Sequence, residues 1–409
     1  MKPTEKTKKN SSKVSSRLSL GERVPKLRFP GFEGVWEAKS LRNECTFYSG
    51  GTPDSTNKEF YNGNIPFIRS AEIDKSVTQL FLTKKGLNGS SAKLVSIGDL
   101  LLALYGANSG EVAISRINGA INQAILCIRS NTVNIKFLKY LLERDKESII
   151  NRYLQGGQGN LSAEIIKELN FYFPDRISQD KITYLLEMVE KRIAAQRKLV
   201  ELLKKHKRGL IKHLFRPIEH TKWKSVRLGD VGTFHKGAPL SKADISEDGK
   251  PFILYGELYT TYGEIIKDVV RRTTAEIDIP YLSRCGDVII PTSGETAEEI
   301  ATASCIMSDG VVLGGDLNIY RSEHIDGRFL AYAVRFIISR DISRIAQGVS
   351  VVHISATELK RISVSIPSKD EQIHIISVLE NYDNRILHSQ EILKKMETTK
   401  DGLLQQLFV

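Results

Sequence analysis

The 409-residue sequence lacks several features that would place it in a common class of protein. Its four cysteines form no CxxC pair and have no ligand-spaced histidine nearby, so we expect buried or surface thiols without a redox role in a reducing compartment. No apolar run is long enough to span a bilayer, and no secretory segment opens the chain. We therefore expect a cytoplasmic protein that does not contact membranes.

Catalytic motifs are missing as well. The sequence has no phosphate-binding GxxxxGK[ST] loop, no HExxH, no GxSxG, and neither of the methyltransferase motifs (the glycine-rich one and the Asn/Asp-Pro-Pro-aromatic one). His206 and His213 lie one heptad apart among lysines and arginines. We interpret them as part of a solvated basic helix face and not as a metal site, because no carboxylate or cysteine ligand accompanies them. No catalytic residue and no metal ligand are predicted.

Positive charge is present in excess. The chain has 59 Lys and Arg against 48 Asp and Glu, a formal net charge of +11. This balance favours a polyanionic partner, of which nucleic acid is the commonest, although a merely basic soluble protein stays open at this point. Residues 1–23 are rich in Lys and Ser, and we expect a disordered basic tail.

An internal duplication organises the rest of the chain. The segment Trp36–Leu41 recurs as Trp223–Leu228, and from Ser162 to Phe215 the matching residue lies 193 positions later without a gap. A period near 190 residues is too long for a solenoid repeat and predicts two copies of a domain-plus-helix unit. The predicted boundaries are 24–174 for the first domain, 175–217 for the first helix, 218–367 for the second domain and 368–409 for the second helix.

The two globular parts mix short strand-like runs with helical ones, which indicates an α+β fold. Strands are expected at 65–68, 100–104, 125–128 and 287–290, and helices at 136–150 and 328–345.

Two long heptad patterns follow the prolines at 174 and 367. Both patterns turn polar at the same two places, Gln196 with Ser389 and Lys207 with Lys400. Matched heptads in one chain predict a coiled coil, and a pseudo-two-fold axis between two copies makes the helices antiparallel. Helices of this length would form a rod of roughly 50–60 Å, enough to separate two domains by at least one DNA turn. The predicted seam consists of Ile182, Leu186, Val189, Ile193, Val200, Leu203, Leu210, Leu214, Ile375, Leu379, Tyr382, Ile386, Leu393, Met396, Leu403 and Leu407.

Several motifs resemble those of a known family. The opening VPKLRFPGFEGVW at residues 24–36, the GGTP turn at 50–53, the strand NIPFIR at 64–69 and the duplicated order of motifs are similar to the specificity subunits of type I restriction–modification systems. The resemblance covers the chain from about residue 24 to its end. It implies two target-recognition domains that each read one half of an asymmetric bipartite DNA site, with an antiparallel coiled coil between them.

The resemblance also implies partners and cofactors. Two methyltransferase subunits would bring adenosylmethionine, and two restriction (motor-nuclease) subunits would use ATP and Mg. The specificity subunit itself would be non-catalytic and would need no cofactor, in agreement with the missing motifs.

Polar residues on loops are the candidates for DNA contact, because Lys and Arg bind phosphates while Asn, Gln, Ser and Tyr read bases. The predicted set is Lys58, Arg69, Tyr105, Asn108, Gln155, Gln158 and Asn160 in the first domain and Lys236, Tyr255, Thr292, Ser293, Gln347, Ser350 and His353 in the second.

The two copies differ mainly in loops. PTSGETA at 291–297 replaces ALYGANS at 103–109, and Pro239-Leu240 replaces the GxTP turn, which suggests that each domain reads a different sequence. Two alternatives stay open: a stand-alone coiled-coil-linked DNA-binding regulator, and a self-contained enzyme with diverged motifs.

Overall fold

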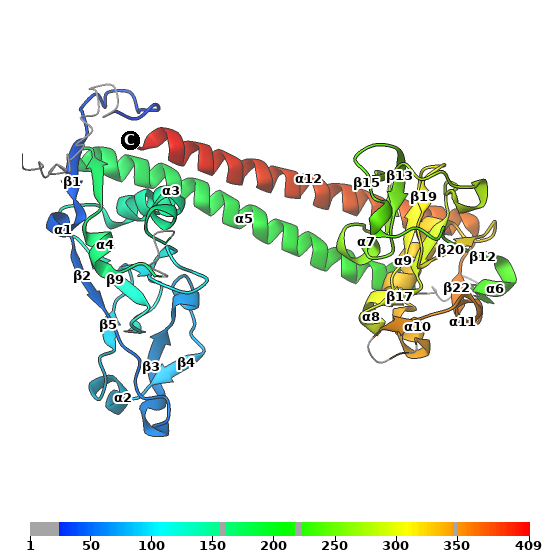
Figure 1. Ribbon diagram of the computed structural model, residues 1–409, viewed down its shortest axis with the longest axis horizontal. Coiled ribbons are helices and arrows are strands. Elements are labelled where there is room, and N and C mark those ends of the chain that lie inside the picture. The colour runs from blue at the N-terminus through cyan, green and yellow to red at the C-terminus, as the bar shows by residue number, and fades with distance from the viewer. Residues whose placement is uncertain (1–23, 155–159, 217–222, 347, 349–350) are drawn as a thin grey trace, which may run out of the picture. The chain divides into compact units, whose positions relative to one another are not determined.

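The structure, a computed structural model, describes residues 24–154, 160–216, 223–346, 348 and 351–409. The chain divides into two compact units: the first unit, Met1–Gln196 with Ile392–Val409, and the second unit, Arg197–Glu391. Each unit holds an α+β head and parts of two long helices, α5 (Arg176–Leu214) and α12 (Lys369–Leu407) (Figure 1). The predicted α+β class and the two heads, separated in the chain by long helices, are confirmed.

Three small sheets form the described part of the first head. Their strands, in sheet order, are β1 (Glu37–Ser40) with β10 (Asn170–Phe173); β2 (Thr46–Ser49), β9 (Ile125–Arg129), β6 (Leu100–Ala103) and β7 (Val112–Ile114); and β4 (Leu80–Leu82), β3 (Tyr61–Ile68), β8 (Gly119–Ile121) and β5 (Lys93–Val95). The helical segments are α1 (Leu41–Glu44), η2 (Lys58–Phe60), η3 (Ser70–Glu72), α2 (Lys84–Asn88), α3 (Ile135–Leu154) and α4 (Ala163–Lys167).

The second head repeats this plan with additions. Its strands, in sheet order, are β11 (Lys224–Arg227) with β22 (Ser363–Ile366); β12 (Thr233–Lys236), β20 (Leu317–Arg321), β16 (Val288–Pro291), β18 (Ser304–Ile306) and β14 (Ile265–Ile266); β15 (Arg271–Thr273), β13 (Lys250–Ile253) and β19 (Val312–Leu313); and β17 (Ser293–Gly294) with β21 (Val352–His353). The helical segments are α6 (Leu228–Val231), η4 (Lys242–Asp244), α7 (Glu257–Thr260), η5 (Ile279–Tyr281), α8 (Ala297–Ile300), α9 (Gly327–Phe336), α10 (Ser339–Ile345) and α11 (Ala356–Lys360).

The two copies share a Gly-Asp pair before a central strand, Gly98-Asp99 before β6 and Gly286-Asp287 before β16, and its aspartate has a structural role. Asp99 accepts hydrogen bonds from the guanidinium of Arg129 at the end of β9, at 2.7 and 2.5 Å. Asp287 holds Arg321 at the end of β20 in the same way, at 2.9 Å for both bonds. Burial raises the pKa of Asp99, but Arg129 outweighs burial and the net pKa is lowered. The motif therefore closes the central sheet of each head with a charge-assisted clamp.

One predicted helix was wrong. The sequence predicted a continuous helix over 328–345, but the second head breaks it into α9 and α10 around Ile337 and Ile338. Ile338 is buried, and Ser343 donates a hydrogen bond of 2.9 Å to the carbonyl of Ala297 in α8. The turn thus lets α10 pack on α8, a helix without a counterpart in the described part of the first head. In the first head the corresponding α3 is continuous.

Each head closes on an aromatic cluster that includes the end of a long helix. In the second unit, Phe215 stacks on Phe329 with ring centroids 4.7 Å apart. In the first unit, Phe408 contacts Phe137 at 5.0 Å. Arg144 also donates a hydrogen bond of 2.8 Å to the carbonyl of Val409. Phe408 and Val409, which follow α12, therefore complete the core of the first unit.

The long helices pack against each other within each unit. In the first unit the beginning of α5, with Ile182 and Leu186, shares a core cluster with Leu404 and Leu407 at the end of α12. In the second unit the end of α5, with Ile211, shares a core cluster with the beginning of α12. The paired segments therefore run antiparallel, as expected.

A mostly buried lysine marks the polar position of the seam in each unit, since 15% of the Lys400 side chain and 10% of the Lys207 side chain are exposed. In the first unit Lys400 of α12 lies 2.9 Å from Glu190 of α5 and also contacts Glu143. In the second unit the roles are exchanged, because Lys207 of α5 contacts Asp383 of α12 and Glu264 at 3.0 Å. The carboxylates accept further hydrogen bonds from Tyr140 at 2.9 Å and from Tyr332, respectively. Each lysine thus joins both helices to the head.

The sixteen residues predicted for the seam lie in α5 and α12. Nine of them are buried: Ile182, Leu186, Ile193, Val200, Leu203, Ile375, Leu379, Ile386 and Leu407. The others are partly buried: Val189, Leu210, Leu214, Tyr382, Leu393, Met396 and Leu403.

Lys400 gives a first prediction. Lys400→Met removes the ammonium from Glu190 and Glu143, whose side chains are 35% and 30% exposed, so the free energy of unfolding should fall by about 1–2 kcal/mol. Urea unfolding of the full chain measures this loss. Lys394→Met on the exposed side of the same helix is the control and should change the free energy by under about 0.5 kcal/mol. Equal losses of unfolding free energy in the two variants would contradict a stabilising role for the Lys400 ion pairs.

Glu190 gives a second prediction, on pH. Burial raises its pKa, but Lys139 and Lys400 outweigh burial and the net pKa lies below its ordinary value. The Glu190 carboxylate therefore binds a proton more tightly in the unfolded chain than in the folded one. Its contribution to the free energy of unfolding is complete above a pH of about 4.5 and is lost as the pH falls through the pKa of the folded protein.

The difference in unfolding free energy between wild type and Glu190→Gln should therefore shrink as the pH falls below about 4.5. Urea titrations at several pH values measure it. Glu187→Gln, on the same helix, is the control and should show a smaller pH dependence.

Candidate nucleic-acid interface

The loop after the central strand occupies an equivalent place in both heads. In the first head the carbonyl of Leu104, just after β6, accepts a hydrogen bond of 3.0 Å from the amide of Leu161. In the second head the carbonyl of Thr292, just after β16, accepts one of 2.9 Å from the amide of Ile354. The loop after the strand therefore meets the segment before α4 or α11. We call this place the loop edge of each head.

In the second head the loop edge gathers three predicted residues. Ser293 in β17 pairs with His353 in β21, and Ser293 Oγ lies 3.2 Å from His353 Nδ1. The hydroxyl of Thr292 donates a hydrogen bond of 3.3 Å to the carboxylate of Asp316. Ser293 is buried whereas His353 is exposed, so His353 is the group of this pair that reaches solvent.

In the first head the loop edge has a different backbone. Residues 104–111 form a compact turn, in which the amide of Gly110 donates a hydrogen bond of 2.8 Å to the carbonyl of Ala103. The predicted Tyr105 and Asn108 are half-buried in this turn. The predicted Asn160 is exposed, and it directly precedes Leu161, whose amide bonds to this loop. Burial raises the pKa of Tyr105, so its hydroxyl stays a neutral donor and acceptor.

A second loop reaches the same edge. Lys236, at the end of β12, pairs with Asn318 of β20, and Asn318 also pairs with Ile290 of β16. The next residue, Gly237, has no room for a side chain, because a Cβ would lie 1.8 Å from the carbonyl oxygen of Gly314. A Cβ on Gly50 in the first head would lie equally close to the carbonyl oxygen of Ile121. Glycine at these positions therefore permits the close backbone approach that brings the turn to the edge.

The remaining described candidates stand apart. Arg69 is held within its head, because its guanidinium contacts Glu72 at 3.0 Å and the side chain of Gln79 at 2.6 Å. Tyr255 is half-buried and makes an edge contact with Tyr259 at 6.5 Å. Lys58 is exposed in η2.

Four predicted residues, Gln155, Gln158, Gln347 and Ser350, lie outside the described residues.

Two polar residues at the loop edges were missed from the sequence. Gln123 accepts a hydrogen bond of 2.6 Å from Thr52 of the GGTP turn, and Asp316 accepts the bond from Thr292. Both are exposed, and each lies just before a matched strand, Gln123 before β9 and Asp316 before β20. The duplication could have identified them, because each is a polar residue at the entrance to a strand that the two copies share.

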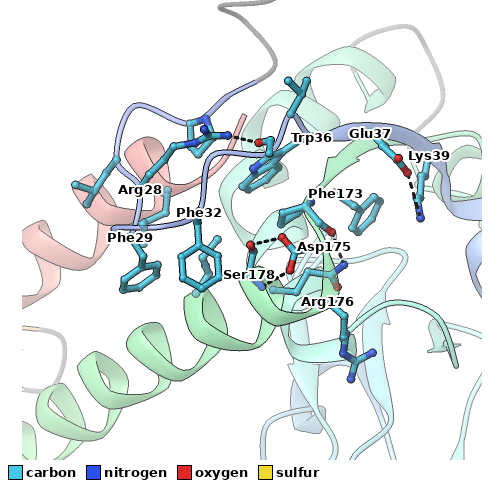
Figure 2. Close-up of a pocket in the computed structure, with 18 of the residues that line it drawn as sticks. Arg28, Phe29, Phe32, Trp36, Glu37, Lys39, Phe173, Asp175, Arg176 and Ser178 are labelled. Atoms are coloured by element: carbon cyan, nitrogen blue, oxygen red, sulfur yellow. Dashed lines mark hydrogen bonds and ion pairs between the residues drawn. The ribbon is translucent and has the colours of Figure 1, made fainter.

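The opening motif lies on the helices and not at the loop edge. The amide of Leu27 donates a hydrogen bond of 2.9 Å to the carbonyl of Gln406, one of the last carbonyls of α12. Lys181 of α5 lies 4.4 Å from the ring centroid of Phe32. Figure 2 shows Phe29 and Phe32 next to α5, beside a cavity of about 280 Å³. The motif therefore caps α12 and covers the beginning of α5.

No group of three His, Cys, Asp or Glu side chains suited to a metal ion occurs among the residues that the structure describes. No helix in this part of the chain is long and apolar enough to cross a membrane.

Comparison with known proteins decides the family. The model of the type I restriction modification DNA specificity domain matches twice, at residues 34–205 and 220–398. The chain belongs to this family. It is therefore the DNA specificity subunit of a type I restriction–modification system, the non-catalytic part of the enzyme complex.

Relatives match over most of their length. The specificity subunits of the type I restriction enzymes MjaVIII and MjaIX from Methanocaldococcus jannaschii are each 21% identical, and each match covers 91% of this chain and 92% of the relative. The fold is similar to the crystal structure of the type I restriction–modification S subunit from M. genitalium, with a TM-score of 0.59, 16% identity and coverage of 94% of this chain and 99% of that one. A second structure, from work on complex assembly of the type I restriction–modification system, matches with a TM-score of 0.60 at 16% identity. That match covers 91% of this chain and 97% of the other.

The different loop edges give a third prediction. If the loop edge of the second head reads bases, Ser293→Ala with His353→Ala should relax specificity in one half of the recognised sequence, with a loss of about 1–3 kcal/mol of discrimination for each lost base contact. Mapping of methylated adenines in cells that carry the variant measures this. The other half of the site should stay unchanged and is the internal control. Equal relaxation in both halves would contradict separate reading.

Proposed function

We propose that this specificity subunit reads an asymmetric DNA site in two parts, one part with each head. The observation that carries the proposal is the contrast within the duplication. The heads share the clamp of Asp99 or Asp287 and the central sheet, but a compact turn stands at one loop edge and β17, β21 and α8 stand at the other. A shared scaffold with unlike loops is what two different base sequences require, since base contacts specify and backbone contacts position.

The reading residues proposed are those of the loop edges. In the second head they are Lys236, Thr292, Ser293 and His353, and in the first head Tyr105, Asn108 and Asn160. Lys58, Arg69, Tyr255, Gln155, Gln158, Gln347 and Ser350 stay in the proposal as further contacts. For Arg69 the proposal requires that a phosphate or base compete with Glu72, which already holds its guanidinium.

The helices are proposed to hold the heads at a fixed separation and to carry two methyltransferase subunits. Exposed apolar side chains support docking. In the first unit Ile177 and Tyr184 of α5 are 67% and 66% exposed and lie one heptad apart. In the second unit Ile373 and Leu387 of α12 are 52% and 58% exposed and lie two heptads apart. Exposed apolar side chains on both long helices are consistent with the docking of partner proteins.

The chemistry is proposed to reside in those partners. Methyltransferase subunits would bring adenosylmethionine, and two restriction subunits would bring ATP-dependent translocation and cleavage with Mg. We infer that the complex works in the cytoplasm, where its DNA substrate is found.

A change of helix length tests the proposal. One heptad inserted into the middle of both α5 and α12 adds about 10 Å of helix, the rise of about three base pairs. The preferred spacer between the half-sites should lengthen by up to about three base pairs, as measured by mapping methylated adenines. Insertion into α5 alone is the control and should abolish methylation, because the seam loses its register.

Two outcomes would overturn the proposal. One is an unchanged spacer after the double insertion. The other is tight, specific binding by the purified chain without any methyltransferase partner and without a spacer requirement, which would favour the stand-alone regulator.

A further inference from the structure

The second half of α5 carries a charge that the duplication does not explain. Residues 197–216 contain eight Lys and Arg and one Glu. The matching stretch of α12, 390–409, contains three Lys, two Glu and one Asp. The apolar seam positions and Lys207 with Lys400 match between the two stretches. The seam therefore does not need this charge, because the copy with the same seam forms its helix without it.

The charge lies on the outer face of the helix. Lys198, Lys205 and Lys212 are spaced by seven residues, so they lie on one face, and all three are exposed. The seam residues Val200 and Leu203 between them are buried, at 4% and 7% exposure. The outer face therefore points away from the seam.

Four of these eight cations make no ion pair in the part of the chain that the structure describes. Within the described residues, Lys198, Lys205, Arg208 and Lys212 make no ion pair, whereas the buried Lys207 is fully engaged with Asp383 and Glu264. Four like charges on one helix face repel each other and destabilise the isolated helix slightly. A polyanion that neutralises them would remove this cost.

The spacing of the charges fits a phosphate backbone. Seven helical residues rise about 10.5 Å, which is the rise of about three base pairs of duplex DNA. An acidic protein helix would present carboxylates at heptad spacing too, but it would need an apolar contact to be stable. On the same stretch only Leu199 and Leu202 are exposed apolar side chains, at 44% and 43%. The repeated lysines therefore favour the nucleic acid.

We propose that this basic face of α5, formed by Lys198, Lys205, Arg208 and Lys212, binds the sugar-phosphate backbone of the DNA spacer that neither head reads. The proposal rests on the proposed function, since it requires a site in two parts. Such contacts would carry no sequence information and would add affinity and a fixed orientation of the helices on the duplex.

Salt dependence of binding tests the proposal. The complex of the full chain with its methyltransferase subunits is titrated with a duplex that contains the two half-sites, over a range of salt concentrations. Each phosphate contact contributes about 0.9 to the slope of log K against log salt. Lys205→Gln with Lys212→Gln should reduce the slope by about 1.8, and the quadruple Gln variant by about 3.6. Lys394→Gln with Lys395→Gln on α12 is the matched control and should leave the slope unchanged.

A second measurement uses the unaltered protein. Uncharged methylphosphonate linkages confined to the spacer should reduce the slope for the wild-type complex, and they should have little further effect on the quadruple variant. The same linkages placed outside both half-sites should affect both proteins equally.

The outcomes are distinct. An unchanged slope in the quadruple variant, or a wild-type complex that ignores the methylphosphonate spacer, overturns the inference. A variant that no longer co-purifies with the methyltransferase while its slope is unchanged overturns it in favour of a protein partner. If the wild-type complex does not protect two DNA patches, the proposed function fails independently of this inference.

Discussion

The pairing of α5 with α12 through a mostly buried lysine in each unit is the contact on which the remaining structure depends. A seam of apolar residues alone could slip by one heptad at small cost, because one apolar layer resembles the next. Lys400 and Lys207 each require a carboxylate on the opposite helix, and Glu190 and Asp383 supply it. Any other register would leave charges buried without partners, which is far more costly than a misplaced leucine.

The same lysines connect the helices to the heads. Glu190 and Asp383 also accept hydrogen bonds from Tyr140 of α3 and Tyr332 of α9. A buried glutamine near the beginning of each long helix also bonds that helix to its head. Gln179 accepts a hydrogen bond from the amide of Asn134 at 2.9 Å, and Gln372 accepts one from Asp326 at 2.8 Å. Polar groups without alternative partners thus set the position of each helix on its own head.

Much of the fold could be predicted from the sequence, because a pattern that occurs in both copies of the duplication rarely arises by chance. The heptads of α5 and α12, the strands β3, β6, β9 and β16 and the two-head plan followed from matched apolar spacing. The break between α9 and α10 could not be predicted from the sequence, because Ile337 and Ile338 continue the helical pattern and only packing on α8 turns the chain. Arg69 was predicted as a DNA contact, but its guanidinium is held by Glu72 and Gln79, three and ten residues later in the chain, and no periodic pattern of the sequence indicates these bonds.

The position of Phe408 has a consequence for synthesis. Chains are made from the amino end, and domains fold as they emerge. Phe137 of the first head packs on Phe408, which is translated after the whole second head, whereas Phe329 of the second head packs on Phe215, which is translated before it. The head that leaves the ribosome first is therefore the one whose core closes last, and a chain that has not yet reached Phe408 exposes Phe137 without its partner ring.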